Sequence, residues 1–194
     1  MEKKNCFPGT TIMTDVVNRR RINDALDHIF AGGDIYRSQV IALTGIEPYS
    51  IQNWIARGFV SHSENKQYTK RQLCRFIIIN MLSDTMQIGE ITDMLSSVNG
   101  DLSDEGDDLI PDDVLYGCFA ELCAMNEGAL NPAKLSANAQ SITEDLTFLR
   151  AEDRETVAEI LKTMFYAYRS AEMSRIAHDL LENIRTKIKG KGEQ

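Results

Sequence analysis

The chain has 194 residues, 43% of them apolar and 26% charged, with a formal net charge of −8. This length suffices for one medium domain or two small ones with real cores, and no apolar run reaches the roughly 18 residues of a membrane-spanning helix. The N-terminal residues include two lysines with no apolar segment behind them, so we expect no secretory signal peptide.

Charge is distributed unevenly along the chain. Residues 1–80 hold 11 Lys+Arg and 7 Asp+Glu, a net +4, whereas residues 81–194 hold 10 and 22, a net −12. A basic N-terminal part joined to an acidic C-terminal part is typical of a protein that binds DNA with one region and carries a separate helical body. The overall acidity therefore does not exclude DNA binding.

The first 32 residues are expected to form an arm and a helix. Residues 1–13 are interpreted as a disordered or loosely docked arm. A cap at residues 14–15 would begin a helix that runs to about Phe30 and ends at the two glycines that follow. The run Arg19-Arg20-Arg21 is interpreted as a solvated face, with contact to DNA phosphates as the alternative.

A pattern typical of a helix-turn-helix follows. Residues 35–44 have apolar positions available for a core, and Gly45 provides a tight connection because a positive φ is cheap only for glycine. The next helix is expected over Pro48–Arg57. A proline suits a first helical turn, where its missing N–H would have no partner. Ile51 and Ile55, four residues apart, are expected to face inward.

A small wing is expected to complete this motif. Phe59 and Val60 would begin an extended piece, Ser61–Asn65 is a polar turn, and Gln67–Tyr68 would be the return strand. We therefore interpret residues 33–98 as a winged helix-turn-helix, including the helices that follow the wing.

Two helices are predicted after the wing. Thr69 and Gln72 have the spacing of a capping box, which predicts a helix from Lys70 to about Ser83. A shorter helix is expected next, with Ile88, Ile91, Met94 and Leu95 at helical spacing. The first of the two is expected to bury Leu73, Phe76, Ile77 and Met81.

Residues 99–194 are expected to form an acidic loop and a helical region. The loop, Asp101–Asp113, is interpreted as a solvated linker or as the acidic start of the next helix, where carboxylates interact favourably with the helix dipole. Its ligand spacing fails the template of a calcium loop. Helices are expected over Leu115–Met125 and near Ile142–Leu149, with a loop at Asn126–Ala139 between them.

The last element is predicted to be helical from Asp153 to about Ile188, with two apolar stripes that point in opposite directions. Either the chain bends near Ser170–Ser174 or the two halves pack against different partners. The second alternative suits a helix that completes its own core and then forms a homodimer. The first stripe contains Val157, Ile160, Leu161, Met164, Phe165 and Tyr168, and the second contains Ile176, Leu180, Leu181, Ile184 and Ile188.

Signals for catalysis or a cofactor are weak. His28, His62 and His178 lie far apart in sequence and near no nucleophile motif, and the chain has no phosphate-binding glycine loop and no zinc-protease motif. The four cysteines form no Cys-x-x-Cys pair. We therefore expect no enzyme activity, no cofactor and no metal, and reduced thiols in a cytoplasmic protein.

The helix Pro48–Arg57 carries side chains suited to the DNA major groove. Gln and Asn can hydrogen-bond adenine, and Arg can bind guanine or phosphate. Cations of the wing and the next helix would contact the DNA backbone. Trp54 is interpreted as a packing residue, with contact to a sugar-phosphate as the alternative. The candidate DNA-binding residues are Ser50, Gln52, Asn53, Arg57, His62, Lys66, Lys70 and Arg71, with Arg75 as a further cation.

These residues resemble the winged helix of MerR-type transcriptional regulators, through Leu43–Ile46, Ile51–Ile55, Arg57–Val60 and Lys66–Thr69. The chain is more similar still to a bacterial family of unknown function that carries such a domain, over about residues 33–127. The resemblance implies a transcriptional regulator whose second helix enters the major groove and whose wing touches the DNA backbone. An acidic loop and a further helix precede the long helix here, so the dimer arrangement of MerR proteins does not transfer directly.

Two functions remain as hypotheses. The first is a MerR-like transcriptional regulator that binds double-stranded DNA as a homodimer through its C-terminal helix. The second is a winged-helix protein-interaction or adaptor module without DNA binding, favoured by the acidic loop and a pI near 4.9. A contiguous positive face spanning Arg57, Lys66 and Arg71 would favour DNA, and a face neutralised by nearby acids would favour the adaptor.

Overall fold

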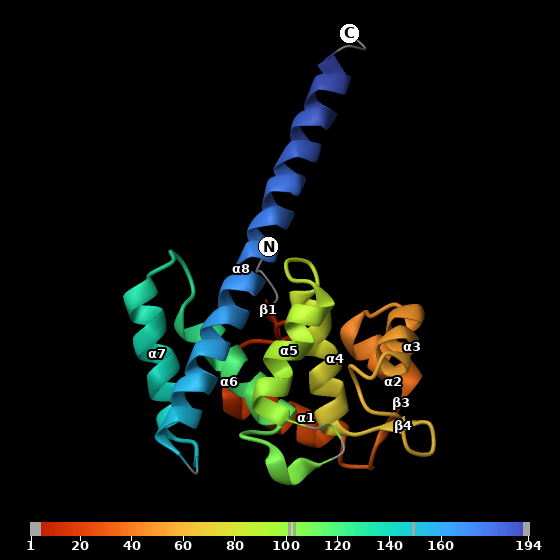
Figure 1. The fold of residues 1–194 in the computed structure, drawn as a ribbon. Coiled ribbons are helices and arrows are strands. Elements are labelled where there is room, and N and C mark those ends of the chain that lie inside the picture. The colour runs from red at the N-terminus through yellow and green to blue at the C-terminus, as the bar shows by residue number, and fades with distance from the viewer. Residues whose placement is uncertain (1–4, 101, 103, 149, 192–194) are drawn as a thin grey trace.

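The fold is mainly α-helical, as the periodicity predicts. The computed structural model describes residues 5–100, 102, 104–148 and 150–191. Two short antiparallel sheets accompany the helices, β1 (Asn5–Cys6) with β2 (Met13–Thr14) and β3 (Ile35–Tyr36) with β4 (Gln67–Tyr68). The helices, seen in Figure 1, are α1 (Arg19–Ile29), α2 (Arg37–Thr44), α3 (Pro48–Ala56), α4 (Lys70–Leu82), α5 (Ile88–Asn99), the 3-10 helix η1 (Glu105–Asp107), α6 (Asp112–Met125), α7 (Pro132–Glu144) and α8 (Ala151–Lys191).

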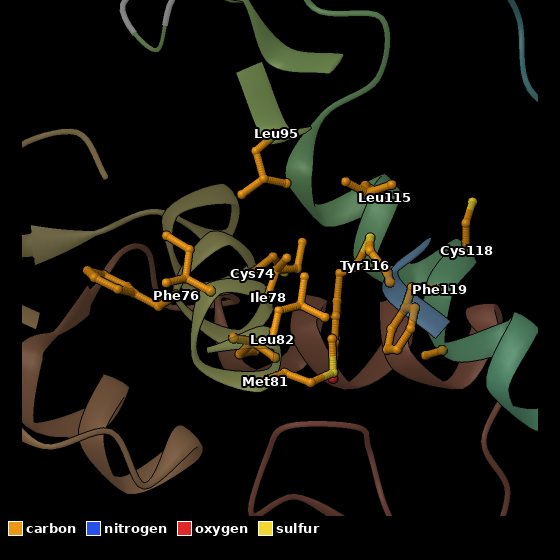
Figure 2. Packing of buried hydrophobic residues seen from close by; sticks show 14 of the residues in the cluster. Cys74, Phe76, Ile78, Met81, Leu82, Leu95, Leu115, Tyr116, Cys118 and Phe119 are labelled. Atoms are coloured by element: carbon orange, nitrogen blue, oxygen red, sulfur yellow. The ribbon is translucent and has the colours of Figure 1, made fainter. Parts of the chain in front are cut away.

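Helix α4 lies at the centre of the fold. Seven consecutive residues from Leu73 to Ile79 are buried, and a helix that is buried on every side must be covered by several neighbours. Helices α5, α6 and α8 provide this cover. Figure 2 shows Ile78 and Leu82 of α4 lying toward Tyr116 of α6 in the shared core. The capping box predicted at the start of α4 is confirmed, because Gln72 N donates to Thr69 Oγ1 and Thr69 N donates to Gln72 Oε1.

The prediction of a disordered or loosely docked arm is wrong for the described residues 5–13. They form a hairpin that packs against the body, with Phe7 buried and Tyr116 Oη donating to Pro8 O at 2.7 Å. Thr11 donates from its N and its Oγ1 to the carbonyls of Leu43 and Ala42, at the C-terminal end of α2. An aromatic anchor and these bonds to a helix end fix the arm.

The first helix begins later than predicted. Asn18 is its N-cap and accepts a hydrogen bond from Arg21 N, so the caps expected at residues 14–15 are wrong. Helix α1 therefore starts within the Arg19-Arg20-Arg21 run. Arg20 and Arg21 are exposed, as expected of a solvated face, but Arg19 pairs with Glu121 at 3.2 Å and Asp145 at 3.0 Å.

The small two-stranded sheet is confirmed, but its predicted pairing is wrong. The strand Gln67–Tyr68 pairs with Ile35–Tyr36 rather than with the chain at Phe59 and Val60, which forms a bend. Tyr68 packs edge-on against Phe76 with ring centroids 5.5 Å apart. The strand before α2 is thus the one that holds the return strand against α4, a long-range contact that local pattern does not reveal.

One helix lies where a loop was predicted. Helix α7 spans Pro132–Glu144, so the predicted loop at Asn126–Ala139 ends already at Asn131. The helical turn predicted near Ile142–Leu149 is the last turn of this longer helix and stops at Glu144, and Leu149 lies outside the described residues. The Asn131-Pro132 pair was expected to interrupt helical structure, but it begins this helix. Asn131 Oδ1 accepts from Lys134 N, and the proline occupies the first helical position.

Helix α8 runs without interruption through Ser170–Ser174, so of the two alternatives the bend does not occur. Its first half packs against the body, with Val157, Leu161 and Met164 fully buried. Its second half projects away from the body (Figure 1). Within the described ranges, no helix is long and apolar enough to cross a bilayer.

Candidate nucleic-acid interface

Helices α2 and α3 are joined by a tight turn, as predicted. Gly45 has φ = 70° and its N–H donates to Ile41 O at 2.8 Å, which ends α2. Thr44 Oγ1 donates to Val40 O at 2.7 Å and accepts from Ile46 N at 3.2 Å, so its hydroxyl bridges the two sides of the turn. These contacts fix the direction in which α3 leaves the turn.

The inner face of α3 anchors the helix to the body. Ile51 is fully buried and Trp54 is 8% exposed, with its ring stacked on Phe76 at 6.3 Å between centroids. The packing interpretation of Trp54 is therefore confirmed. Ile55 is half-buried, less than the inward position predicted for it.

The outer face of α3 is exposed and uncharged. Tyr49, Gln52 and Ala56 are exposed, and Asn53 is half-buried between them in the same helical arc. Tyr49 is 74% exposed and was not among the predicted site residues. Tyr49 lies four residues before Asn53, and this spacing in the sequence already places both side chains on the same face of the helix. Ser50, also half-buried, lies toward the side of the helix that leads to Arg57.

Arg57 ends α3 and faces the segment that follows. Its guanidinium carbon lies 4.6 Å from the centroid of the Phe59 ring, a cation–π contact that orients an otherwise exposed side chain. The guanidinium lies at the surface beside the outer face of α3.

The turn of the wing presents His62 and Lys66, which are both exposed. Asn65 and Lys66 have φ values of 49° and 64°, and Gln67 N donates to Glu64 O at 2.8 Å. Positive φ at both central residues is the geometry of the tight type I′ turn. Gln72 of α4 donates from Nε2 to the carbonyls of Ser61 and His62 and thereby holds the segment before the turn in place.

Two predicted phosphate contacts, Lys70 and Arg71, are engaged by acids of the same chain. Lys70 Nζ lies 2.9 Å from an oxygen of Asp27 and 3.1 Å from one of Asp113. Burial would lower the pKa of the Lys70 ammonium, but the hydrogen bonds to these carboxylates outweigh it and raise this pKa above its usual value. Arg71 donates to Asp108, whose side chain is 7% exposed.

Arg75 is buried, so the prediction that it contacts DNA is wrong. Its side chain is 3% exposed, and its Nε donates to Phe59 O at 2.8 Å. Its Nη1 lies 3.3 Å from both carboxylate oxygens of Asp112. Burial raises the pKa of the Asp112 carboxyl, more than the neighbouring Arg75 lowers it. Sequence periodicity alone gave no sign of this long-range pair.

The acidic segment, defined as residues 104–113, is therefore a structural part of the site and not a solvated linker. Its Asp108, Asp112 and Asp113 neutralise the cations on the first two turns of α4. The alternative interpretation, an acidic start of the next helix, is confirmed for Asp112 and Asp113, which lie in the first turn of α6. Of the eight predicted residues, three lie on α3 with Arg57 at its C-cap, His62 and Lys66 lie before and within the turn at Glu64–Gln67, and Lys70 and Arg71 lie beside the acidic segment.

A cavity of about 390 Å³ separates the wing turn from the acidic segment. Its lining includes His62 and Arg71 as well as Asp104 and Asp108. The described residues include no group of three or more His, Cys, Asp or Glu side chains that could hold a metal ion. The surface here is of mixed sign, whereas the outer face of α3 is polar and neutral.

Comparison with known proteins identifies one domain. Residues 26–119 match the family model described as a domain of unknown function (DUF1836), a range from α1 to α6 that includes both the α2–α3 pair and the acidic segment. No curated protein and no solved structure matches the chain. The expected similarity to a family of unknown function is thus confirmed, and the likeness to MerR regulators remains a prediction.

Proposed function

We propose that this protein is a DNA-binding transcriptional regulator of MerR-like type, with α3 as the helix that enters the major groove. The observation that carries the proposal is the outer face of α3. It presents Gln52 and Asn53, which can donate and accept at base edges, on a helix held rigidly by Ile51 and Trp54 beneath it. Tyr49 adds an exposed aromatic group on the same face.

The flanking cations support the same docking. Arg57 at the end of α3 and Lys66 at the tip of the wing turn are exposed, and neither is neutralised by an ion pair in the described residues. His62 lies on the same turn. Lys70 and Arg71 would contribute only if DNA phosphates replaced the carboxylates that now bind them, so the basal affinity for DNA rests on few phosphate contacts.

A mobility-shift assay across salt concentrations tests the proposal, with genomic fragments as the probe. Asn53→Ala should weaken specific binding by about 1–3 kcal/mol, the usual cost of one lost bidentate base contact. Arg57→Ala should weaken binding to all sequences alike and reduce the slope of log K against log salt by about 0.9.

Arg154→Ala provides the matched control, because Arg154 is an exposed arginine on the first turns of α8. It should bind DNA like the wild type. Absence of any complex at low salt, or equal binding by wild type, Asn53→Ala and Arg57→Ala, would show that α3 is not a DNA reader.

A protein-interaction or adaptor module is the second candidate. The ion pairs of Lys70 with Asp27 and Asp113, and of Arg71 with Asp108, favour it, since they neutralise cations that a DNA reader would use. Under this alternative Tyr49 would be an aromatic anchor for a protein partner. Pull-down of a stable protein partner that Tyr49→Ala abolishes, together with no DNA complex, would select it.

The proposed regulator acts in the cytoplasm as a homodimer, formed through the outer half of α8. The described cysteines are all free thiols, which fits a reducing compartment. A dimer would present two copies of α3 to successive half-sites of an operator.

A further inference from the structure

The cavity between the wing turn and the acidic segment contains a hydrogen-bond donor that the fold leaves unused. Arg75 lines this cavity, although its side chain is only 3% exposed. Its Nε donates to Phe59 O, and its Nη1 donates to Asp112 at 3.3 Å and to Asn99 at 3.5 Å. In the described part of the chain, the third nitrogen of the guanidinium, Nη2, has no acceptor.

This third nitrogen is open to the cavity. Within the described ranges, the only buried side-chain nitrogen or oxygen that lacks a hydrogen bond is an oxygen of Glu121, which lies in an ion pair with Arg19. Nη2 of Arg75 also lacks a hydrogen bond, so it must be accessible to solvent. The cavity is the surface that Arg75 lines, and Nη2 therefore points into it. A guanidinium donor in this position is suited to a carboxylate.

Four carboxylates line the same cavity, and the fold neutralises two of them. Asp108 and Asp112 are bonded to arginines of α4. Glu64 and Asp104 form no ion pair with any other described residue, and both are exposed. The cavity thus combines an unused donor on the buried Arg75 with two carboxylates at the surface that still lack a cation.

This combination distinguishes between classes of ligand. A simple anion would bond to Nη2 of Arg75 but would face the two carboxylates that lack a cation. A simple cation would pair with those carboxylates and leave Nη2 without an acceptor. The lining holds two arginines and four carboxylates, which with a neutral His62 gives a net charge of −2. A ligand that carries one carboxylate and more than one cationic group satisfies all of these conditions.

We propose that this cavity binds a basic amino acid. Its carboxylate accepts from Nη2 of Arg75, and its two cationic groups face Glu64 and Asp104. Leu102, which is half-buried in the lining, provides apolar surface for the aliphatic part of the ligand. The volume of about 390 Å³ lies within the usual range of small-molecule sites, roughly 300–1,000 Å³. This site goes beyond the proposed function and does not rest on it.

Isothermal titration calorimetry of the full chain, without DNA, tests the site. The probes are L-lysine and L-arginine, each compared with the amine that lacks its carboxylate, cadaverine and agmatine. At least one of the amino acids should bind with a stoichiometry of one. Its amine should bind at least about tenfold more weakly, because the charge-assisted hydrogen bond to Nη2 is lost. This comparison examines the Arg75 contact without disturbing the buried pair with Asp112. Equal affinities for an amino acid and its amine would overturn the proposal.

The acidic side of the site is tested by substitution. Glu64→Gln combined with Asp104→Asn should weaken binding of the amino acid by at least about tenfold. Both positions are exposed, so the thermal unfolding measured by circular dichroism should not change. Asp84→Asn combined with Asp93→Asn removes two exposed carboxylates that do not line the cavity and is the matched control. An unchanged affinity in the Glu64 and Asp104 double variant would place the bound amino acid elsewhere and refute the site.

Two further results would also overturn the proposal. No binding of either amino acid at about 1 mM would mean that water alone satisfies Nη2 of Arg75. Binding of acetate or inorganic phosphate as strong as that of the amino acids would identify a simple anion site, in which the two surface carboxylates have no role.

Discussion

At the scale of single residues, the Arg75–Asp112 pair has the largest predicted effect. Both side chains are buried, and burial raises the pKa of the Asp112 carboxyl more than the neighbouring Arg75 lowers it. The cost of removing two charges from water offsets much of their mutual attraction. Such a pair adds little net stability, but each charge depends on the other. The pair joins α4 to α6 at the base of the candidate interface.

Asp112→Ala should therefore destabilise the protein by about 3–5 kcal/mol, because it leaves the Arg75 guanidinium buried without its counter-charge. The double replacement Arg75→Met with Asp112→Leu should be less destabilising than the single one. Urea denaturation followed by circular dichroism measures both. Additive effects of the Arg75→Met and Asp112→Leu single replacements would show that the two charges are independent.

The two isoleucines of α3 give a second prediction at this scale. The sequence assigns Ile55 to the buried face and predicts a cost of roughly 2–4 kcal/mol for Ile55→Ala. The structure buries Ile51 fully and Ile55 only in part. Ile51→Ala should therefore cost about 2–5 kcal/mol, and Ile55→Ala less. Equal midpoints in the same denaturation assay would contradict this order.

At the scale of elements, the acidic segment changes the electrostatics of the neighbouring helix. By sequence α4 begins with two adjacent cations, Lys70 and Arg71, which suggest a phosphate-binding surface. The fold returns Asp108 and Asp113 to these cations from about 40 residues further along the chain. Any DNA bound there must compete with these carboxylates.

Asp108→Asn combined with Asp113→Asn should consequently strengthen DNA binding and steepen its salt dependence, by about 0.9 in slope for each further phosphate that the protein neutralises. Asp84→Asn with Asp93→Asn removes the same charge from two exposed positions and serves as the control. Fluorescence anisotropy with labelled duplex measures both. Identical salt slopes for the two double variants would mean that the acidic segment does not mask DNA-binding cations.

At the scale of the whole molecule, one core unites the arm, the α2–α3 pair and the first half of α8. Buried apolar residues run from Phe7 in the arm to Phe165 in α8. The candidate reading helix lies at one side of this body, and the exposed half of α8 projects away from it (Figure 1). The proposed DNA-reading surface and the proposed dimer contact are therefore separate parts of the molecule.

Much of the helical layout follows from local sequence signals. The glycine turn before α3, the capping box of α4 and the long final helix depend on residues within a few positions of one another, and each is found as predicted. The same local logic failed at Asn131-Pro132, since this pair is as compatible with a helix start as with a loop. The residue types alone could not distinguish a helix start from a loop at this position.

Local sequence alone is enough to predict a mainly helical protein, a helix pair joined at Gly45 with Gln52 and Asn53 on its second member, and a final helix with two apolar stripes. These features depend on periodicity and on conformational preferences that each residue carries wherever it lies. The folded structure is needed to learn that Ile35–Tyr36 pairs with the wing strand and that Arg75 meets Asp112. Strand pairing and ion pairing join residues distant in sequence, and only the packing of the folded chain brings them together.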